Sequence, residues 1–216
     1  MNTLKSIIGV GSLLLLLMTS CEFVEPVPHE SVDLGLSVEW ATCNVGASYP
    51  EEFGDYFAWG ERYSGNGFYA SYKWLDSEGE LSWYSKYWLG DKHADNKTKL
   101  DLYDDAAYAK WGANWRMPTL KEVDELVAKC TWLWSSKNGV TGYKVVGPNG
   151  NSIFLPASGK LSGGKKSYVG TCGYYWSSSL YKENPNRAYV IYTTEETVGN
   201  GNAERYVALP IRPVRK

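Results

Sequence analysis

Aromatic side chains are the feature that most limits what this chain can fold into. The 216 residues include ten Trp, 17 Tyr and five Phe, together with 22 Gly and nine Pro. Glycine and proline mark turns and interrupt long elements, while large rings need a folded interior that can bury them. This combination favours short strands, many turns and long ordered loops over a bundle of helices.

Length and charge narrow the class of protein further. The composition shows no break from Asp33 to Lys216, so we expect this stretch to form one domain. The formal net charge is -2 at pH 7, and basic residues do not cluster beyond Lys165 and Lys166. Because the phosphates of a nucleic acid require a basic face, we expect no nucleic-acid partner.

The first residues predict export. A positively charged start precedes an apolar run over residues 7–18, which is short for a membrane-spanning helix. Small residues then lead into Cys21, as in a bacterial lipobox, where the cysteine is acylated. We expect a lipoprotein signal peptide over 1–20, lipidation of Cys21 and a tether over 21–32, with an ordinary cleaved secretory signal as the alternative. A lipid anchor would hold the protein at the outer membrane, exposed at the cell surface.

Two helices are predicted in the first half of the chain. Residues 101–111 have helical character, with Gly112 as a stop signal. The second helix has a clearer start, because Thr119 followed by Glu122 forms a capping box ahead of an apolar stripe that runs to Cys130.

Strands are predicted mainly in the second half. Alternating apolar residues indicate a strand over 34–42, and a tight turn at 147–151 predicts a hairpin. The further strands that the pattern indicates are 174–178, 188–193 and 205–211. Helices followed by many strands are typical of an α+β domain.

Signatures of catalysis are sparse. Asp91, His93 and Asp95 alternate and could offer metal ligands, but Asn96 and Leu102 do not fit a calcium-binding loop, so we expect a solvated loop. No nucleophile elbow, phosphate-binding loop or zinc motif occurs in the sequence. We therefore expect no enzyme activity, no metal and no cofactor. The tryptophans expected in the core are Trp40, Trp59, Trp111, Trp115 and Trp176.

Several collinear motifs give the chain a family resemblance. They are GLSVEWATCNVGA, GDYFAWGE, WGANWRMPTLKEVDEL, CTWLW, GVTGYKVVGPNGNSIFLPASG, GYYWSSSL and RYVALPIRPV. In these motifs the chain resembles the Bacteroidetes lipoproteins that carry a Fibrobacter succinogenes major paralogous domain, over nearly all of residues 33–216. The resemblance implies a C-type lectin-like fold, shared with formylglycine-generating enzymes and with variable proteins of diversity-generating retroelements. In that fold two helices pack on a twisted antiparallel sheet with long ordered loops, and the C-terminal part displays a ligand surface.

The resemblance also bears on the cysteines. Acylation of Cys21 leaves three cysteines, and their spacing does not choose among three possible pairs. Cys43 and Cys130 both lie in the resembling motifs, which favours a disulfide between these two and leaves Cys172 as a spare thiol.

The resemblance places the ligand surface after Trp176. Alternation along the strand predicts Tyr189 and Ile191 inward, and Val190 and Tyr192 outward. An ordinary polar surface loop is the alternative. The predicted ligand-binding residues are Tyr181, Val190, Tyr192, Asn200, Asn202, Glu204 and Val207.

These features predict a surface-anchored lipoprotein that binds an extracellular protein or glycan without catalysis. Calcium-dependent sugar binding is not indicated, because residues 183–185 read ENP instead of EPN. One alternative is a fimbrial accessory or tip subunit, with pilus subunits as partners. An oxidase of the formylglycine-generating type is the weaker alternative, because that chemistry needs two thiols and Cys172 stands alone in the C-terminal part.

Overall fold

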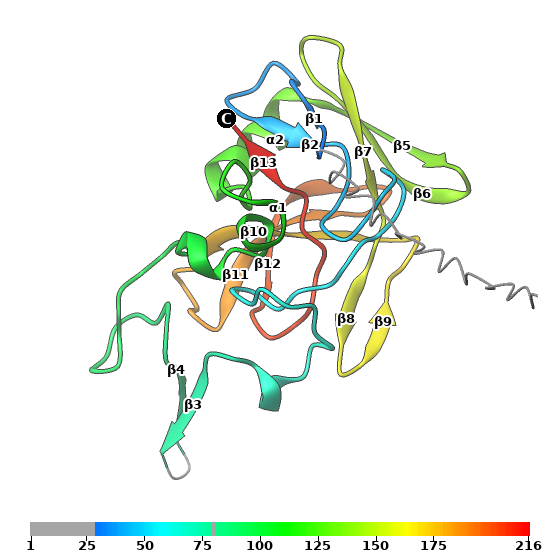
Figure 1. Cartoon of the computed structure of the whole chain (residues 1–216). Coiled ribbons are helices and arrows are strands. Elements are labelled where there is room, and N and C mark those ends of the chain that lie inside the picture. Colours follow the sequence, from blue (N-terminus) through cyan, green and yellow to red (C-terminus); the bar gives the residue numbers. More distant parts are fainter. Residues whose placement is uncertain (1–28, 79–80) are drawn as a thin grey trace, which may run out of the picture.

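The computed structural model describes residues 29–78 and 81–216. The predicted signal peptide, Cys21 and the start of the predicted tether lie outside the described residues. The described part contains two α-helices and 13 short strands in five antiparallel sheets, so the chain is mostly β-structure with two helices, in agreement with the predicted α+β class (Figure 1). No helix in the described ranges has the length and apolar character that crossing a membrane requires.

The sheet of β10 (Gly173–Leu180), β11 (Arg187–Thr193) and β12 (Val198–Glu204) lies in the middle of the molecule. Its two faces cover different parts of the core. Trp176 and Val190 pack on one side with Phe57, Trp59 and Leu209, while Tyr175 and Ile191 pack on the other side against α2 and β6. Large rings on both faces give this short sheet a sizeable buried area.

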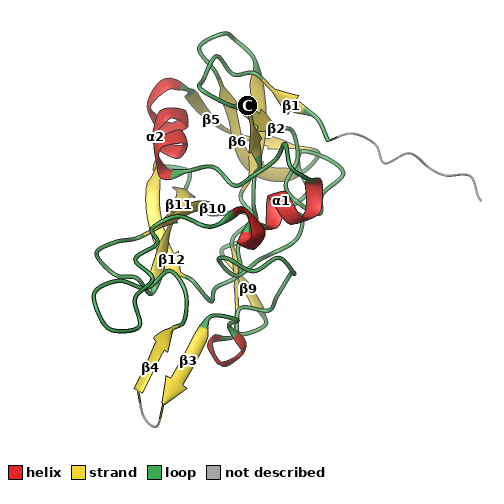
Figure 2. Ribbon diagram, turned by 60° about the vertical axis from the view of Figure 1, so that its left-hand side comes forward, coloured by secondary structure: helices red, strands yellow, loops and turns green. Residues whose placement is uncertain are grey.

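Helix α2 (Leu120–Lys129) begins as its sequence predicts. The Thr119 hydroxyl accepts from the backbone N–H of Glu122, and the Glu122 carboxylate accepts from the N–H of Thr119 at 2.8 Å. This capping box satisfies two N–H groups that a helix start leaves unpaired. Val123 and Leu126 are buried and pack with Tyr175 and Ile191 of the central sheet. The helix lies beside this sheet (Figure 2).

Helix α1 (Ala106–Trp111) is shorter than the predicted helix because a 3₁₀ turn, η2 (Leu102–Asp104), precedes it. Asp105 is the N-cap, accepting from two N–H groups of the first turn and from the N–H of Met117 at 2.8 Å. Burial raises the pKa of Asp105 to about 6, against the opposing effect of these backbone hydrogen bonds. Gly112 ends the helix, as predicted.

Three strands form a meander at one end of the molecule: β5 (Thr131–Lys137), β6 (Val140–Val146) and β7 (Ser152–Pro156). The predicted hairpin is confirmed, with Val146 opposite Ser152 across the turn. Gly147 has a packing reason to be glycine, since a Cβ there would lie 2.1 Å from the Leu34 carbonyl oxygen.

The remaining elements join distant parts of the chain. The strands β1 (Ser31–Val32), β2 (Glu39–Ala41) and β13 (Val214–Arg215) form a sheet that unites both ends of the described chain. Two hairpins project from the body, and a 3₁₀ turn precedes the first (Figure 1). They are β3 (Leu75–Glu78) with β4 (Leu81–Tyr84), and β8 (Lys160–Ser162) with β9 (Lys165–Ser167), and the turn is η1 (Tyr69–Ser71).

Three predicted segments differ from the structure. The predicted strand 34–42 is reduced to β2, and the last residues of the predicted tether form β1. The predicted strand 205–211 is wrong: this stretch crosses the core as irregular chain, held by single bridges from Leu209 to Phe57 and from Ala208 to Leu161. Pro210 donates no backbone hydrogen bond, which prevents a regular ladder there.

The predicted tryptophan core is confirmed for four of its five members. Trp40, Trp59, Trp115 and Trp176 are all at most 5% exposed. Trp111 is half-buried and stacks on His29 with ring centroids 3.8 Å apart.

Cys43, Cys130 and Cys172 are free thiols in the structure. Cys43 and Cys130 are half-buried, whereas Cys172 is buried. The disulfide between Cys43 and Cys130 is not formed here and stays a prediction.

Candidate ligand-binding groove

The structure corrects two of the predicted ligand-binding residues. Val190 is 1% exposed and Val207 is 3% exposed, so neither reaches a ligand on the surface. The predicted orientation of Tyr189 is also wrong, because it is half-buried at the surface while Val190 is enclosed. Both faces of the central sheet contact the core, so a two-residue period does not separate buried from exposed side chains in β11.

The other predicted residues do not form one patch. Tyr192 lies opposite Gly199 and Glu204 opposite Arg187 in the β11–β12 register. These two positions are therefore five residues apart along β11, or about 17 Å. Asn200 donates from Nδ2 to Asp124 Oδ1 of α2 at 2.6 Å.

The two predicted tyrosines pair with other tyrosines. Tyr181 contacts the Tyr189 ring edge-on at a centroid distance of 5.2 Å. Tyr192 packs on Tyr174 with ring centroids 5.1 Å apart. Of the predicted set, Glu204 remains as a residue that lines a surface groove.

This groove, the aromatic groove, lies between the β3–β4 hairpin, the 3₁₀ turn η1 and the turn that joins β10 to β11. Its volume is about 390 Å³. Its lining includes residues of the β3–β4 hairpin, which projects from one end of the molecule (Figures 1 and 2). The residues that line it are Tyr69, Ser82, Trp83, Tyr84, Trp88, Asn184, Asn186, Arg187, Glu204 and Tyr206.

One wall of the aromatic groove is made of rings held in fixed positions. Trp83 of β4 stacks on His93, with centroids 4.0 Å apart and planes at 23°. Tyr69, which is 45% exposed, meets the ring of Tyr206 edge-on at 5.4 Å. Trp88 donates from its indole nitrogen to Asp91 Oδ2 at 2.8 Å. Rings braced in this way offer contact area to a ligand at a low cost in conformational entropy.

A second part of the lining, the polar wall, is a chain of polar groups. Arg187 donates from Nε to the side-chain oxygen of Asn202, and from one terminal nitrogen to Glu204 Oε1 at 3.4 Å. Glu204 Oε2 also accepts from the Tyr206 hydroxyl at 2.9 Å. Burial and this carboxylate raise the pKa of Tyr206. Asn202, a predicted site residue, therefore orients Arg187 from behind instead of lining the groove.

The turn between β10 and β11 adds two exposed amides. The side-chain oxygen of Asn184 accepts a hydrogen bond from the backbone N–H of Asn186 at 3.1 Å, and this bond shapes the turn. Both side chains are exposed and line the aromatic groove. An amide offers a donor and an acceptor on neighbouring atoms, which suits a ligand that carries hydroxyl groups.

Arg205 fixes the floor behind the aromatic groove. Its guanidinium is fully buried, 4.4 Å from the ring centroid of Tyr84, and no described carboxylate pairs with it. It donates to the Tyr72 hydroxyl at 3.0 Å, and to the carbonyl oxygens of Lys86, Tyr87 and Pro185 at 2.9 to 3.2 Å. One side chain thus ties the turn after β10 to the loop after β4.

The alternating acidic loop has a structural role. Asp91 accepts from Trp88 and from the backbone N–H of His93, and Asp95 accepts from the backbone N–H of Trp88 at 3.1 Å. These contacts orient the rings of the aromatic groove. In the part of the chain that the structure describes, no group of three His, Cys, Asp or Glu side chains is placed to hold a metal ion.

Sequence reasoning missed the aromatic wall. Tyr69, Trp83 and Trp88 lie in the stretch 55–95, whose density of Trp and Tyr indicated long ordered loops but no site. The signal was present as aromatic residues among Ser, Asn and Gly, without a period that a regular element would impose.

Comparison with models of protein families, with curated proteins and with solved structures finds no match to this chain. The sequence motifs and the geometry of the aromatic groove therefore carry the functional interpretation.

Proposed function

We propose that this protein is a surface-anchored lipoprotein that binds an extracellular ligand, protein or glycan, without catalysis. A glycan fits the aromatic groove best. The observation that carries this choice is that aromatic rings, of which Tyr69 is exposed and Trp83 and Trp88 are half-buried, line one groove together with amide, guanidinium and carboxylate groups. The faces of the rings pack on the C–H surface of a sugar, and the polar wall bonds its hydroxyl groups.

Charge supports a neutral sugar as the ligand. Arg187 and Glu204 of the polar wall form an ion pair, so the two charges offset each other. Among the described residues that line the aromatic groove, Glu204 is the single carboxylate. Hydrolysis of a glycoside commonly uses two carboxylates on either side of the bond, which supports binding without turnover.

The place of the groove supports display away from the cell. The described chain begins beside β1, at the end of the molecule opposite the β3–β4 hairpin (Figures 1 and 2). Acylation of Cys21 would anchor the protein on the β1 side and leave the aromatic groove facing outward. The sequence motifs and the α+β architecture support a C-type lectin-like fold for the domain.

The first experiment is a glycan array with purified wild-type protein and the Trp83→Ala variant. We expect the variant to bind the recognised glycan at least tenfold more weakly, on the order of 2 kcal/mol for a central aromatic residue. Trp111→Ala is the matched control, because Trp111 is also half-buried and also stacks on a histidine. Equal loss in both variants, or no glycan bound by the wild type, would contradict the proposal.

The anchor has its own test. Wild-type protein expressed in a Gram-negative host should fractionate with the outer membrane and incorporate labelled palmitate. Cys21→Ser should lose the label and leave the membrane fraction. Membrane retention of the unlabelled variant would refute lipid anchoring and leave the glycan proposal standing.

One feature favours a second function, that of a fimbrial accessory or tip subunit. β5 is the outer strand of the β5–β6–β7 sheet, and within the described residues its free side pairs with no other strand. An open strand edge of seven residues is a surface to which a subunit can add a strand. Co-purification of pilus subunits with the wild type, lost on Leu133→Pro, would support this function.

A further inference from the structure

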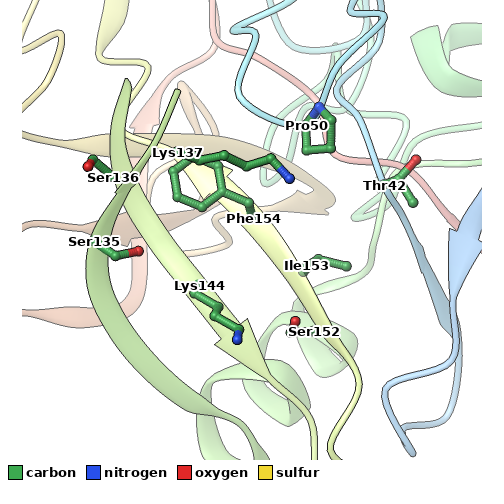
Figure 3. A pocket seen from close by; sticks show the side chains of 9 residues that line it. All are labelled: Thr42, Pro50, Ser135, Ser136, Lys137, Lys144, Ser152, Ile153 and Phe154. Carbon is green, nitrogen blue, oxygen red and sulfur yellow. The ribbon is translucent and has the colours of Figure 1, made fainter. Parts of the chain in front are cut away.

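A second concave surface, the lysine trough, lies on the outer face of the β5–β6–β7 sheet, near Thr42 after β2 and Pro50 (Figure 3). The β5–β6–β7 sheet lies at the opposite end of the molecule from the β3–β4 hairpin, whose residues line the aromatic groove (Figures 1 and 2). The residues that line it are Thr42, Pro50, Ser135, Ser136, Lys137, Lys144, Ser152, Ile153 and Phe154.

Register explains which side chains reach the lysine trough. Leu133, Lys144 and Phe154 lie side by side across the three strands, on the face away from the core residue Val145. Gly142, two residues before Lys144, has no room for a side chain, because a Cβ there would lie 2.4 Å from the Leu155 carbonyl oxygen.

Two lysines stand at separate points of the lysine trough. Lys137 extends over Phe154 towards Pro50, whereas Lys144 extends towards Ser152 (Figure 3). Lys144 lies opposite Leu133, four residues from Lys137 along β5, so the two positions are about 13 Å apart. Neither ammonium group forms an ion pair with another residue that the structure describes.

One carboxylate lies beside the lysine trough. Glu51 follows Pro50 and accepts a hydrogen bond from the side-chain amide of Asn138. Its charge offsets part of the field of Lys137, to which it is close enough to interact. Lys144 has no such neighbour among the trough residues, so the trough has a net positive charge.

We infer that the lysine trough binds an acidic glycan, whose carboxylates contact Lys137 and Lys144 and whose hydroxyl groups contact Ser135 and Ser152. Ser135 and Ser152, whose side chains are on the trough face of the sheet, each offer a donor and an acceptor to sugar hydroxyls. An acidic peptide is less suited, because the N–H and C=O groups of the central strand β6 already pair with β5 and β7. A peptide backbone laid across the middle of this face would find few partners for its own amide groups, and one paired with the free edge of β5 would lie beside the trough instead of across it.

The inference does not depend on the aromatic groove, which is balanced in charge and distant from the lysine trough.

The probe for the lysine trough is tetragalacturonate, a chain of uronic acids, and its control is the same oligosaccharide with every carboxyl group methyl-esterified. Calorimetric titration of the full protein should give binding of the acid and none of the ester. Binding of the acid should also weaken as salt is raised, since exposed charges are screened.

The variant that tests the lysine trough is Lys137→Gln/Lys144→Gln. Removing two exposed ionic contacts should weaken binding of the acid about tenfold. Lys110→Gln/Lys165→Gln is the matched control: both lysines are exposed, the change in net charge is the same, and neither lines the trough. This control should bind as the wild type does.

Several results would overturn the inference. They are equal binding of acid and ester, equal weakening in the control variant, or competition by a glutamate tetrapeptide as strong as that of tetragalacturonate. Trp83→Ala should bind tetragalacturonate normally. Loss of binding in that variant would place the acid in the aromatic groove, which contradicts the lysine trough and the choice of a neutral sugar but leaves glycan binding by the groove in place.

Discussion

Arg187 lies in the polar wall of the aromatic groove and Arg205 lies behind the groove, and the two side chains have different roles. Arg205 is fully buried among aromatic rings and donates only to the protein, whereas Arg187 is half-exposed in the aromatic groove beside Glu204. The last forty residues thus contain both a scaffold and a surface. Within this C-terminal part, side chains at one end of the central sheet are displayed at the surface, while residues 205–214 hold the fold together.

The largest expected effect is on the scaffold. Arg205→Met removes the hydrogen bonds to Tyr72 and to three carbonyl oxygens and leaves these buried groups without a donor. We expect the free energy of unfolding to fall by about 3–5 kcal/mol, measured by urea denaturation. A loss below about 1 kcal/mol would show that Arg205 is not the structural tie described here.

A smaller effect is expected at Val207, which sequence reasoning assigned to the surface. Val207→Ala removes two methyl groups from the core beside Leu209 and should cost about 1–2 kcal/mol of unfolding free energy. Asn200→Ala, at an exposed position, should cost less than about 1 kcal/mol. Equal costs at the two sites would contradict the division between scaffold and surface.

The sequence predicted the fold better than the site. The capping box at Thr119, the 147–151 turn and the tryptophan core were readable because each depends on local chemistry or on large apolar rings. The orientation of Val190 could not be predicted from the sequence, because the central sheet is covered on both faces. Trp83 joins Glu204 in one groove through a contact between segments more than a hundred residues apart, which no local pattern contains.

Acid should weaken the contacts that Asp104 makes behind the aromatic groove. Burial alone would raise the pKa of Asp104, but hydrogen bonds from Lys86 and Tyr87 outweigh it and lower the pKa below its ordinary value. The unfolded chain then binds the proton more readily, so unfolding free energy is lost as pH falls below about 4. Asp104→Asn should flatten this pH dependence in urea denaturation. An unchanged acid slope in the variant would contradict the assignment.

Substitution of Arg187 should affect ligand binding more than stability, whereas substitution of Arg205 should mainly affect stability. Arg187→Met removes a half-exposed ion pair with Glu204 and the hydrogen bonds to Asn202, so the unfolding free energy should fall by about 1 kcal/mol, much less than for Arg205→Met. Binding of the recognised glycan should nevertheless weaken several-fold, because the polar wall loses its donor. A variant that binds normally would exclude Arg187 from the ligand contact.

The aromatic groove is tested most directly by following the indole N–H signals of the tryptophans in an NMR titration with the recognised glycan. The signals of Trp83 and Trp88 should shift on binding. Those of Trp59 and Trp176, whose indoles donate to buried carbonyl oxygens at 2.8 Å, should stay in place. Saturable binding that leaves Trp83 and Trp88 unmoved would contradict the account.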